Sequence, residues 1–214
     1  MDIPPVVVIG LGRFGTSLAN ELMMHGVEVH GIDSSEKLIR DYAPYLTEAT
    51  VADSTDPEAL LQLGLNEVPR VVVAIGEHLE DSILTASNLV EMGVADIWAK
   101  ADSDAHARIL TQLGVHHVIR PERDTGKRVA HLLGMPFHDY AALAEDFGVI
   151  KLSAPAVLTH GAFDAAALYR DHTVQVVAVH RDGVWTPVTD GMTLTVGEEL
   201  VVAGAPKALE RVAR

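Results

Sequence analysis

Residues 6–15 read VVVIGLGRFG, a β-branched run that leads directly into three glycines spaced as Gly-x-Gly-x-x-Gly. A strand that feeds such a turn brings backbone N–H groups and a helix N-terminus close to a phosphate group. Asp33 follows the next apolar run, where a carboxylate can accept hydrogen bonds from a ribose. The stretch therefore predicts a nucleotide-binding domain with Gly10, Gly12 and Gly15 at the phosphates. The distance of Asp33 from Gly15 favours the ribose role over its alternative, a cap of the helix that follows. The Asp33 carboxylate would repel a 2′-phosphate, which disfavours NADP.

The composition narrows the class of protein. The chain has 214 residues, 30 acidic and 16 basic side chains, and no cysteine. A formal net charge of -14 argues against a general nucleic-acid or anionic-lipid surface. The lack of cysteine excludes disulfides, thiolate catalysis and Cys-ligated metals. No apolar stretch reaches the roughly 20 residues of a membrane helix and no signal-peptide pattern begins the chain, so we expect a cytoplasmic protein.

The first 120 or so residues alternate short β-branched runs with amphipathic segments, which is typical of a Rossmann-type doubly wound parallel sheet. A helix is expected over residues 13–25. Two further helix starts are predicted at Ser34-Ser35 and at Asp56-Pro57, because short polar caps and an early proline favour them. The expected strands are residues 6–9, 27–32, 48–51, 71–75, 96–99 and 117–119.

The pattern changes after Pro121. We expect a helix over residues 125–133, then a break at Gly134-Met135-Pro136. This break predicts two domains, residues 1–135 and residues 136–214. The second is expected to be a small α+β domain that depends on a partner copy for stability. Its expected strands are residues 149–152, 174–179, 183–186 and 200–202, and its expected helices are residues 162–168 and 206–212.

Further binding candidates follow the ends of the later strands, where ligands of open α/β sheets lie. Asp53 and Ser54 are placed to face adenine or ribose, although a cap of the next helix is an equally good role for these two residues. Ile75 and Gly76 end the fourth strand close to the nucleotide. Lys100 ends the fifth strand and has two equally good roles, a bond to a phosphate or a structural pair with a carboxylate.

Arg13 and Phe14 lie in the first turn of the phosphate-binding helix and complete the predicted nucleotide contacts. An arginine there is partly redundant with the backbone amides for a diphosphate that bridges two sugars. It is more useful against an additional terminal phosphate. The alternative for Arg13 is a solvated side chain at a helix start.

Six segments follow one another along the chain: Gly10 to Gly15, Asp33, Ala52 to Thr55, Val73 to Gly76, Ile97 to Ala101 and Pro121 to Gly126. Together they resemble the regulatory subunits of bacterial Ktr and Trk potassium uptake systems, which consist of an RCK (KTN) nucleotide-binding domain and a small RCK C-terminal domain. One copy of each domain fits the length of the Ktr type.

The resemblance implies a mechanism and partners. Dimers would assemble into an octameric ring, switched by ATP versus ADP, that docks on a separate membrane subunit at the inner face of the cell membrane. Arg13 would reach a phosphate of the nucleotide in a neighbouring subunit. Glu122 would lie near these phosphates and help to hold Mg²⁺ or another cation, because a carboxylate beside phosphates needs an intervening cation. Its alternative role is a favourable charge at a helix N-terminus.

The resemblance also implies that the C-terminal domain pairs and that such pairs can bind cyclic di-AMP. Residues 165–171 depart from the pattern of that site, since Asp171 beside Arg170 would repel a phosphate. We therefore expect a dimerising module.

An enzyme is disfavoured by the residues themselves. The eleven histidines form no His-x-x-x-His pair, and there is neither a nucleophile elbow nor a Walker lysine. The sequence predicts no catalytic residue. Two alternatives remain open, an NAD(H)-responsive redox sensor and a small nucleotide-dependent enzyme.

Overall fold

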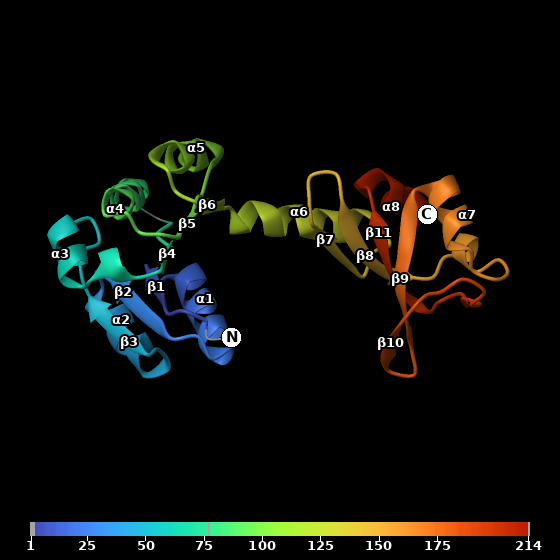
Figure 1. The fold of residues 1–214 in the computed structure, drawn as a ribbon, viewed down its shortest axis with the longest axis horizontal. Helices are drawn as coiled ribbons and strands as arrows, with labels where there is room; N and C mark the ends of the chain where they lie inside the picture. The colour runs from blue at the N-terminus through green and yellow to red at the C-terminus, as the bar shows by residue number, and fades with distance from the viewer. Residues whose placement is uncertain (1–2, 77, 214) are drawn as a thin grey trace. The chain divides into compact units, whose positions relative to one another are not determined.

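A computed structural model describes residues 3–76 and 78–213 of the chain. The chain forms two compact units that divide between Glu122 and Arg123 (Figure 1). The first unit carries a parallel sheet and the second an antiparallel sheet. The predicted fold class is thereby confirmed. Among the described residues, no helix is both long enough and apolar enough to cross a membrane.

The first unit is built on six parallel strands in the order β3-β2-β1-β4-β5-β6. The order reverses between β1 and β4, so the connections from these two strands leave in opposite directions and open a crevice at the carboxyl end of the sheet. The strands are β1 (Val6–Ile9), β2 (Val29–Asp33), β3 (Glu48–Val51), β4 (Arg70–Val73), β5 (Ile97–Lys100) and β6 (His117–Ile119).

Helices cover both faces of this sheet (Figure 1). Two of them begin where the sequence predicts: Ser35 Oγ accepts a hydrogen bond from Leu38 N at 3.3 Å, and Asp56 Oδ1 accepts one from Glu58 N at 2.9 Å. The helices are α1 (Arg13–Met24), α2 (Glu36–Tyr42), α3 (Pro57–Gln62), α4 (Leu79–Glu91) and α5 (Asp104–Leu113), with short 3-10 turns at Ala43–Tyr45 and Leu65–Glu67.

The central strand β1 explains why the opening sequence is continuously apolar. Val6 and Val8 pack with Ala19 of α1 on one face, whereas Val7 and Ile9 belong to the core on the other face. All four side chains are buried. A strand buried on both faces reads as an unbroken hydrophobic run, in contrast to the alternating pattern of a half-exposed strand.

The second unit contains an antiparallel sheet in the order β10-β9-β11-β8-β7. Its core gathers Ile150, Leu152, Val176, Leu200 and Val202 from one side of the sheet. The strands are β7 (Asp139–Ala142), β8 (Gly148–Ser153), β9 (Val174–Arg181), β10 (Val184–Pro187) and β11 (Glu199–Gly204), and the helices are α7 (Ala165–His172), α8 (Pro206–Val212) and a 3-10 turn at Ala156–Leu158.

The helix α6 (Pro121–Gly134) starts earlier than predicted and groups with the second unit from Arg123 onward, so the observed division differs from the predicted one after residue 135. The physical reason is its packing. Leu132 lies against the core of the second unit, Arg128 Nη2 contacts Asp139 Oδ1 at 2.7 Å, and the His131 ring stacks on Tyr140.

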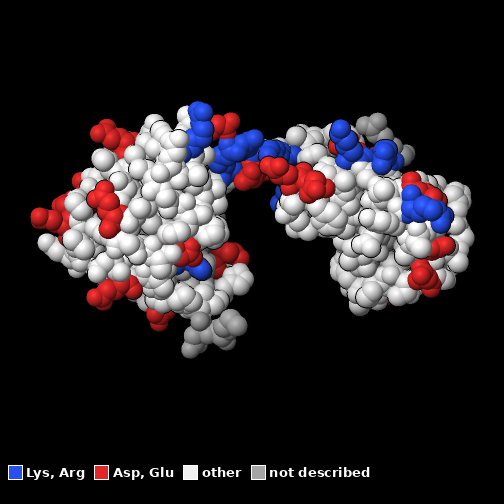
Figure 2. All heavy atoms as spheres, turned by 45° about the horizontal axis from the view of Figure 1, so that its top comes forward, with Lys and Arg blue, Asp and Glu red and all other residues white. Residues whose placement is uncertain are grey.

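Figure 2 shows Lys and Arg side chains gathered along α6, while acidic side chains are scattered over the visible face of the first unit.

A few other predictions needed correction. The sequence missed β7, an edge strand in which only Tyr140 is buried, so it carries no alternating pattern. The helix expected at residues 162–168 is α7, which starts later because Asp164 Oδ1 accepts a hydrogen bond from Ala167 N at 2.9 Å. The strand expected at residues 71–75 ends at Val73, which leaves Ile75 and Gly76 in the loop beyond it.

Candidate nucleotide-binding site

A cavity of about 490 Å³ lies in the first unit, lined by residues that follow the carboxyl ends of β1, β2, β3, β4 and β5. This is the place where open α/β sheets bind ligands. Every predicted binding residue except Gly15 lines the cavity: Gly10, Gly12, Arg13, Phe14, Asp33, Asp53, Ser54, Ile75, Gly76, Lys100 and Glu122.

The glycine loop is fixed by its own backbone. Gly10 has φ +95°, a left-handed conformation that favours glycine, and its N–H donates to Ile32 O at 2.8 Å. Gly15 lies behind the loop, where a Cβ atom would collide with the carbonyl oxygen of Gly10. Gly15 therefore shapes the loop from outside the cavity.

The N-terminus of α1 is open towards a ligand. Gly12 is the N-cap residue and provides no side-chain cap, and the first turn of α1 contains no acidic residue. The first N–H groups of a helix lack intrahelical partners, and the helix dipole places partial positive charge there. A phosphate group would accept hydrogen bonds from these N–H groups, and its negative charge would interact favourably with the dipole.

Asp33 ties two parts of the site together. Its Oδ2 accepts a hydrogen bond from Leu11 N at 2.7 Å, and its Oδ1 accepts one from Ser35 N at 2.8 Å. The carboxylate thus links the glycine loop to the start of α2. Sequence reasoning preferred the ribose role of Asp33 to a cap of the following helix, whose N-cap is Ser35. It missed the link to the glycine loop, because the approach of Leu11 N depends on the fold.

Asp53 and Ser54 differ in their hydrogen-bond partners and in their burial. Asp53 Oδ1 accepts hydrogen bonds from the Thr55 hydroxyl at 2.7 Å and from Thr55 N at 2.9 Å, and these bonds hold the pKa of Asp53 below its usual value. The helix cap considered for Asp53 is supplied by Asp56 instead. Ser54 is buried, and its hydroxyl contacts Thr85 Oγ1 at 2.8 Å.

Lys100 pairs with two carboxylates at the edge of the cavity. Its Nζ lies 2.9 Å from Glu122 Oε1 and 3.1 Å from Asp102 Oδ1. Burial lowers the pKa of Lys100, but the hydrogen bonds and charges of Glu122 and Asp102 outweigh burial, and the net pKa is raised. The Lys100 hydrogen bond is the largest cause of a lowered pKa at Glu122, to which the positive charge of Arg13 also contributes.

Several lining residues escaped the sequence analysis. His78 and Asp81, at the start of α4, complete the wall beyond Gly76. They belong to no motif, so only the course of the chain brings them to the cavity. Within residues 3–76 and 78–213, no group of three or more His, Asp or Glu side chains is arranged to hold a metal ion. The cation at Glu122 stays a prediction.

Comparison with known proteins places the chain in a family. Residues 6–121 match the TrkA-N domain. The Ktr system potassium uptake protein C of Bacillus subtilis (strain 168) is 38% identical over 175 residues, which are 81% of this chain and 79% of that protein. The Ktr system potassium uptake protein A of the same organism is 31% identical over 207 residues, or 95% of this chain and 93% of that protein.

A solved structure agrees on the fold. The crystal structure of the GsuK RCK domain superimposes with a TM-score of 0.66 at 14% identity and covers 98% of this chain. This chain spans only 47% of that longer chain, and at such identity the likeness concerns the fold alone. Since the domain match covers more than half of its length and the similar proteins extend over both units, the chain belongs to the TrkA-N domain family, together with the Ktr potassium uptake proteins.

Proposed function

We propose that the chain is a nucleotide-binding regulatory subunit of a potassium uptake system rather than an enzyme. The observation that carries this proposal is the cavity lined by Gly10, Gly12, Asp33 and Asp53, in a relative of the Ktr proteins. The subunit would act in the cytoplasm on a separate membrane protein that carries the ion. It would stay attached to the inner face of the membrane through that partner.

Each part of the cavity has a role in this proposal. The backbone amides of the glycine loop and the N-terminus of α1 bind the phosphates. Asp33 accepts hydrogen bonds from the ribose hydroxyls with the lone pairs that Leu11 and Ser35 leave free. Asp53, Ser54, Ile75 and Gly76 surround the adenosine. Together these contacts select an adenine nucleotide with an unsubstituted ribose.

We further propose that ATP and ADP favour different arrangements of an oligomeric ring, formed from dimers and octameric as a whole. A nucleotide can shift such an equilibrium only through its different affinity for the two arrangements. A hundredfold difference corresponds to about 2.7 kcal/mol, enough to dominate a balanced equilibrium. Arg13 lines the cavity and its side chain is exposed. In the proposed ring it would contact a phosphate of the nucleotide in a neighbouring copy.

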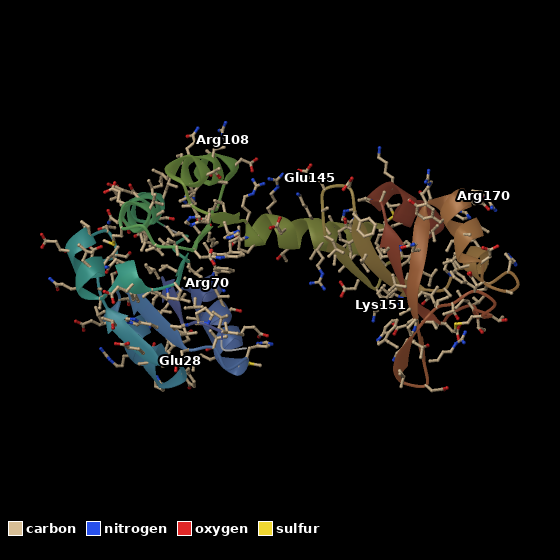
Figure 3. The ribbon with its side chains drawn as sticks, in the orientation of Figure 1. Glu28, Arg70, Arg108, Glu145, Lys151 and Arg170 are labelled. Carbon is tan, nitrogen blue, oxygen red and sulfur yellow. The ribbon has the colours of Figure 1, made fainter. Side chains whose placement is uncertain are left out.

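Replacing Arg13 with alanine is expected to weaken ATP binding about tenfold and ADP binding less, because a charge-assisted hydrogen bond to the terminal phosphate is lost. Isothermal titration of the full chain with ATP and ADP, with and without Mg²⁺, measures both affinities. The matched control is Arg108→Ala. Arg108 is exposed on α5, away from the cavity-lining residues, and its side chain points into solvent (Figure 3). Equal loss in both variants would contradict the role of Arg13.

The same titration tests the second candidate, an NAD(H)-responsive sensor. The Asp33 carboxylate suits the adenosine ribose of NAD as well as that of ATP. Titration with NADH and NAD⁺ therefore belongs in the series. A clear preference for NADH that Arg13→Ala leaves unchanged would replace the ATP switch with a redox sensor.

A further inference from the structure

Glu122 occupies a position that is unusual for an acid in a phosphate site. It lines the cavity together with Arg13 and Lys100, and its Oε1 lies 2.9 Å from Lys100 Nζ. The positive charge of Arg13 acts on it as well. The carboxylate thus pairs with Lys100 inside the cavity lining. A phosphate entering the cavity would compete with Glu122 for the ammonium group of Lys100.

Lys100 is held in place independently of Glu122. Its side chain is only 12% exposed, and Asp102 Oδ1 lies 3.1 Å from its ammonium group. Gly76 leaves the space that this ammonium needs, since a Cβ atom at position 76 would lie 2.8 Å from Lys100 Nζ. If Glu122 moved away, Asp102 would keep the ammonium at the edge of the cavity.

Glu122 is free to move in a way that Lys100 is not. Its side chain is 68% exposed, and it belongs to the first turn of α6, directly after Pro121. Water screens the exposed Glu122 end of this ion pair, and the Glu122 side chain loses rotamer freedom in it, so the pair contributes little free energy. Its loss is a small cost when a stronger anion is available.

We propose that Glu122 is a built-in competitor for the phosphate groups of the nucleotide: in the ligand-free chain its carboxylate occupies Lys100, and a nucleoside phosphate displaces it. This inference rests on the proposed function. Lys100 then becomes the side chain that recognises phosphate charge. Because Glu122 belongs to the first turn of α6, its displacement transmits the binding of a nucleotide to this turn. The chain leaves the first unit through the same helix.

The competition has a distinctive consequence. Removing a competitor strengthens binding, whereas removing a ligand weakens it. We expect Glu122→Gln to raise the affinity for ADP and ATP about fivefold in EDTA, a change in the range expected for one screened ion pair. Adenosine, which carries no phosphate, should bind both proteins equally. A pure cation-holding role for Glu122 predicts no gain in EDTA.

The test is isothermal titration of the full-length protein with adenosine, ADP and ATP in EDTA. Asp124→Asn is the matched control, because it removes the same charge two residues further along α6 and does not line the cavity. Lys100→Met should weaken ADP and ATP binding, and adding Glu122→Gln to Lys100→Met should restore nothing. Melting temperatures show whether each variant is folded.

The outcomes separate this inference from the proposed function. A gain for Glu122→Gln with ADP and ATP that is absent for adenosine and for Asp124→Asn supports the competition. If the unchanged protein binds nucleotides but Glu122→Gln shows no gain, or an equal gain with adenosine, the competition is overturned and the proposed function stands. If the unchanged protein binds none of the three ligands, both are overturned.

Discussion

Replacing Gly15 with alanine is expected to destabilise the first unit by about 2 to 4 kcal/mol and to abolish nucleotide binding. The new Cβ atom would collide with the backbone oxygen of Gly10, and backbone cannot swing aside as a flexible side chain can. Overpacking of this kind costs about 1 to 3 kcal/mol, occasionally more. The displaced Gly10 would also distort the phosphate loop. Denaturant unfolding followed by Trp98 fluorescence in a Trp185→Phe background reports on the first unit, since the chain contains two tryptophans.

Gly12→Ala is the matched control within the same loop. Nothing lies within 4 Å of a Cβ atom at position 12, and Gly12 has φ −71°, so the backbone accepts alanine. Alanine is a poorer N-cap than glycine, so we expect a loss of stability, but one of only about 1 kcal/mol. Because Gly12 lines the cavity, nucleotide affinity should still fall at least tenfold by obstruction of the phosphate. If Gly15→Ala were as stable as Gly12→Ala, the close approach to Gly10 would not matter.

Much of the fold was predictable because local sequence and tertiary environment agree. β1 is a continuous apolar run and is buried on both faces, and the caps at Ser35 and Asp56 sit where short polar residues precede helices. An element can be predicted from the sequence when the local sequence pattern and the tertiary environment favour the same structure. β7 was not predictable for the opposite reason, since three of its four side chains are not buried and the strand pairs only with β8.

The site was predictable as a set of positions but not as a set of contacts. The carboxyl ends of parallel strands meet at one edge, so strand ends alone brought Asp33, Asp53 and Lys100 to one cavity. The partners of these side chains come from elsewhere in the chain. Glu122 reaches Lys100 from the start of α6, and His78 joins from the loop before α4. No spacing rule in the sequence carries that information.

Replacing Asp33 with alanine is expected to lower nucleotide affinity about a hundredfold and to destabilise the first unit by about 2 kcal/mol. The affinity falls because the ribose hydroxyls lose a charged acceptor, and a hydrogen bond to a charged group contributes about 1.5 to 3 kcal/mol. The stability falls because Leu11 N and Ser35 N both lose their acceptor. Titration with ADP and the Trp98 unfolding measurement give the two quantities separately.

The variant Asp53→Ala is a control that separates the two roles of Asp33, which are nucleotide binding and the link between the glycine loop and α2. The Asp53 carboxylate also lines the cavity, but its hydrogen bonds run only to the neighbouring Thr55, in an exposed turn. Its loss should weaken ADP binding with less than about 1 kcal/mol of destabilisation, because water can replace a carboxylate there. If Asp33→Ala weakened ADP binding with as little destabilisation as Asp53→Ala, the link between the glycine loop and α2 would be dispensable. Asp33 would then act on the nucleotide alone.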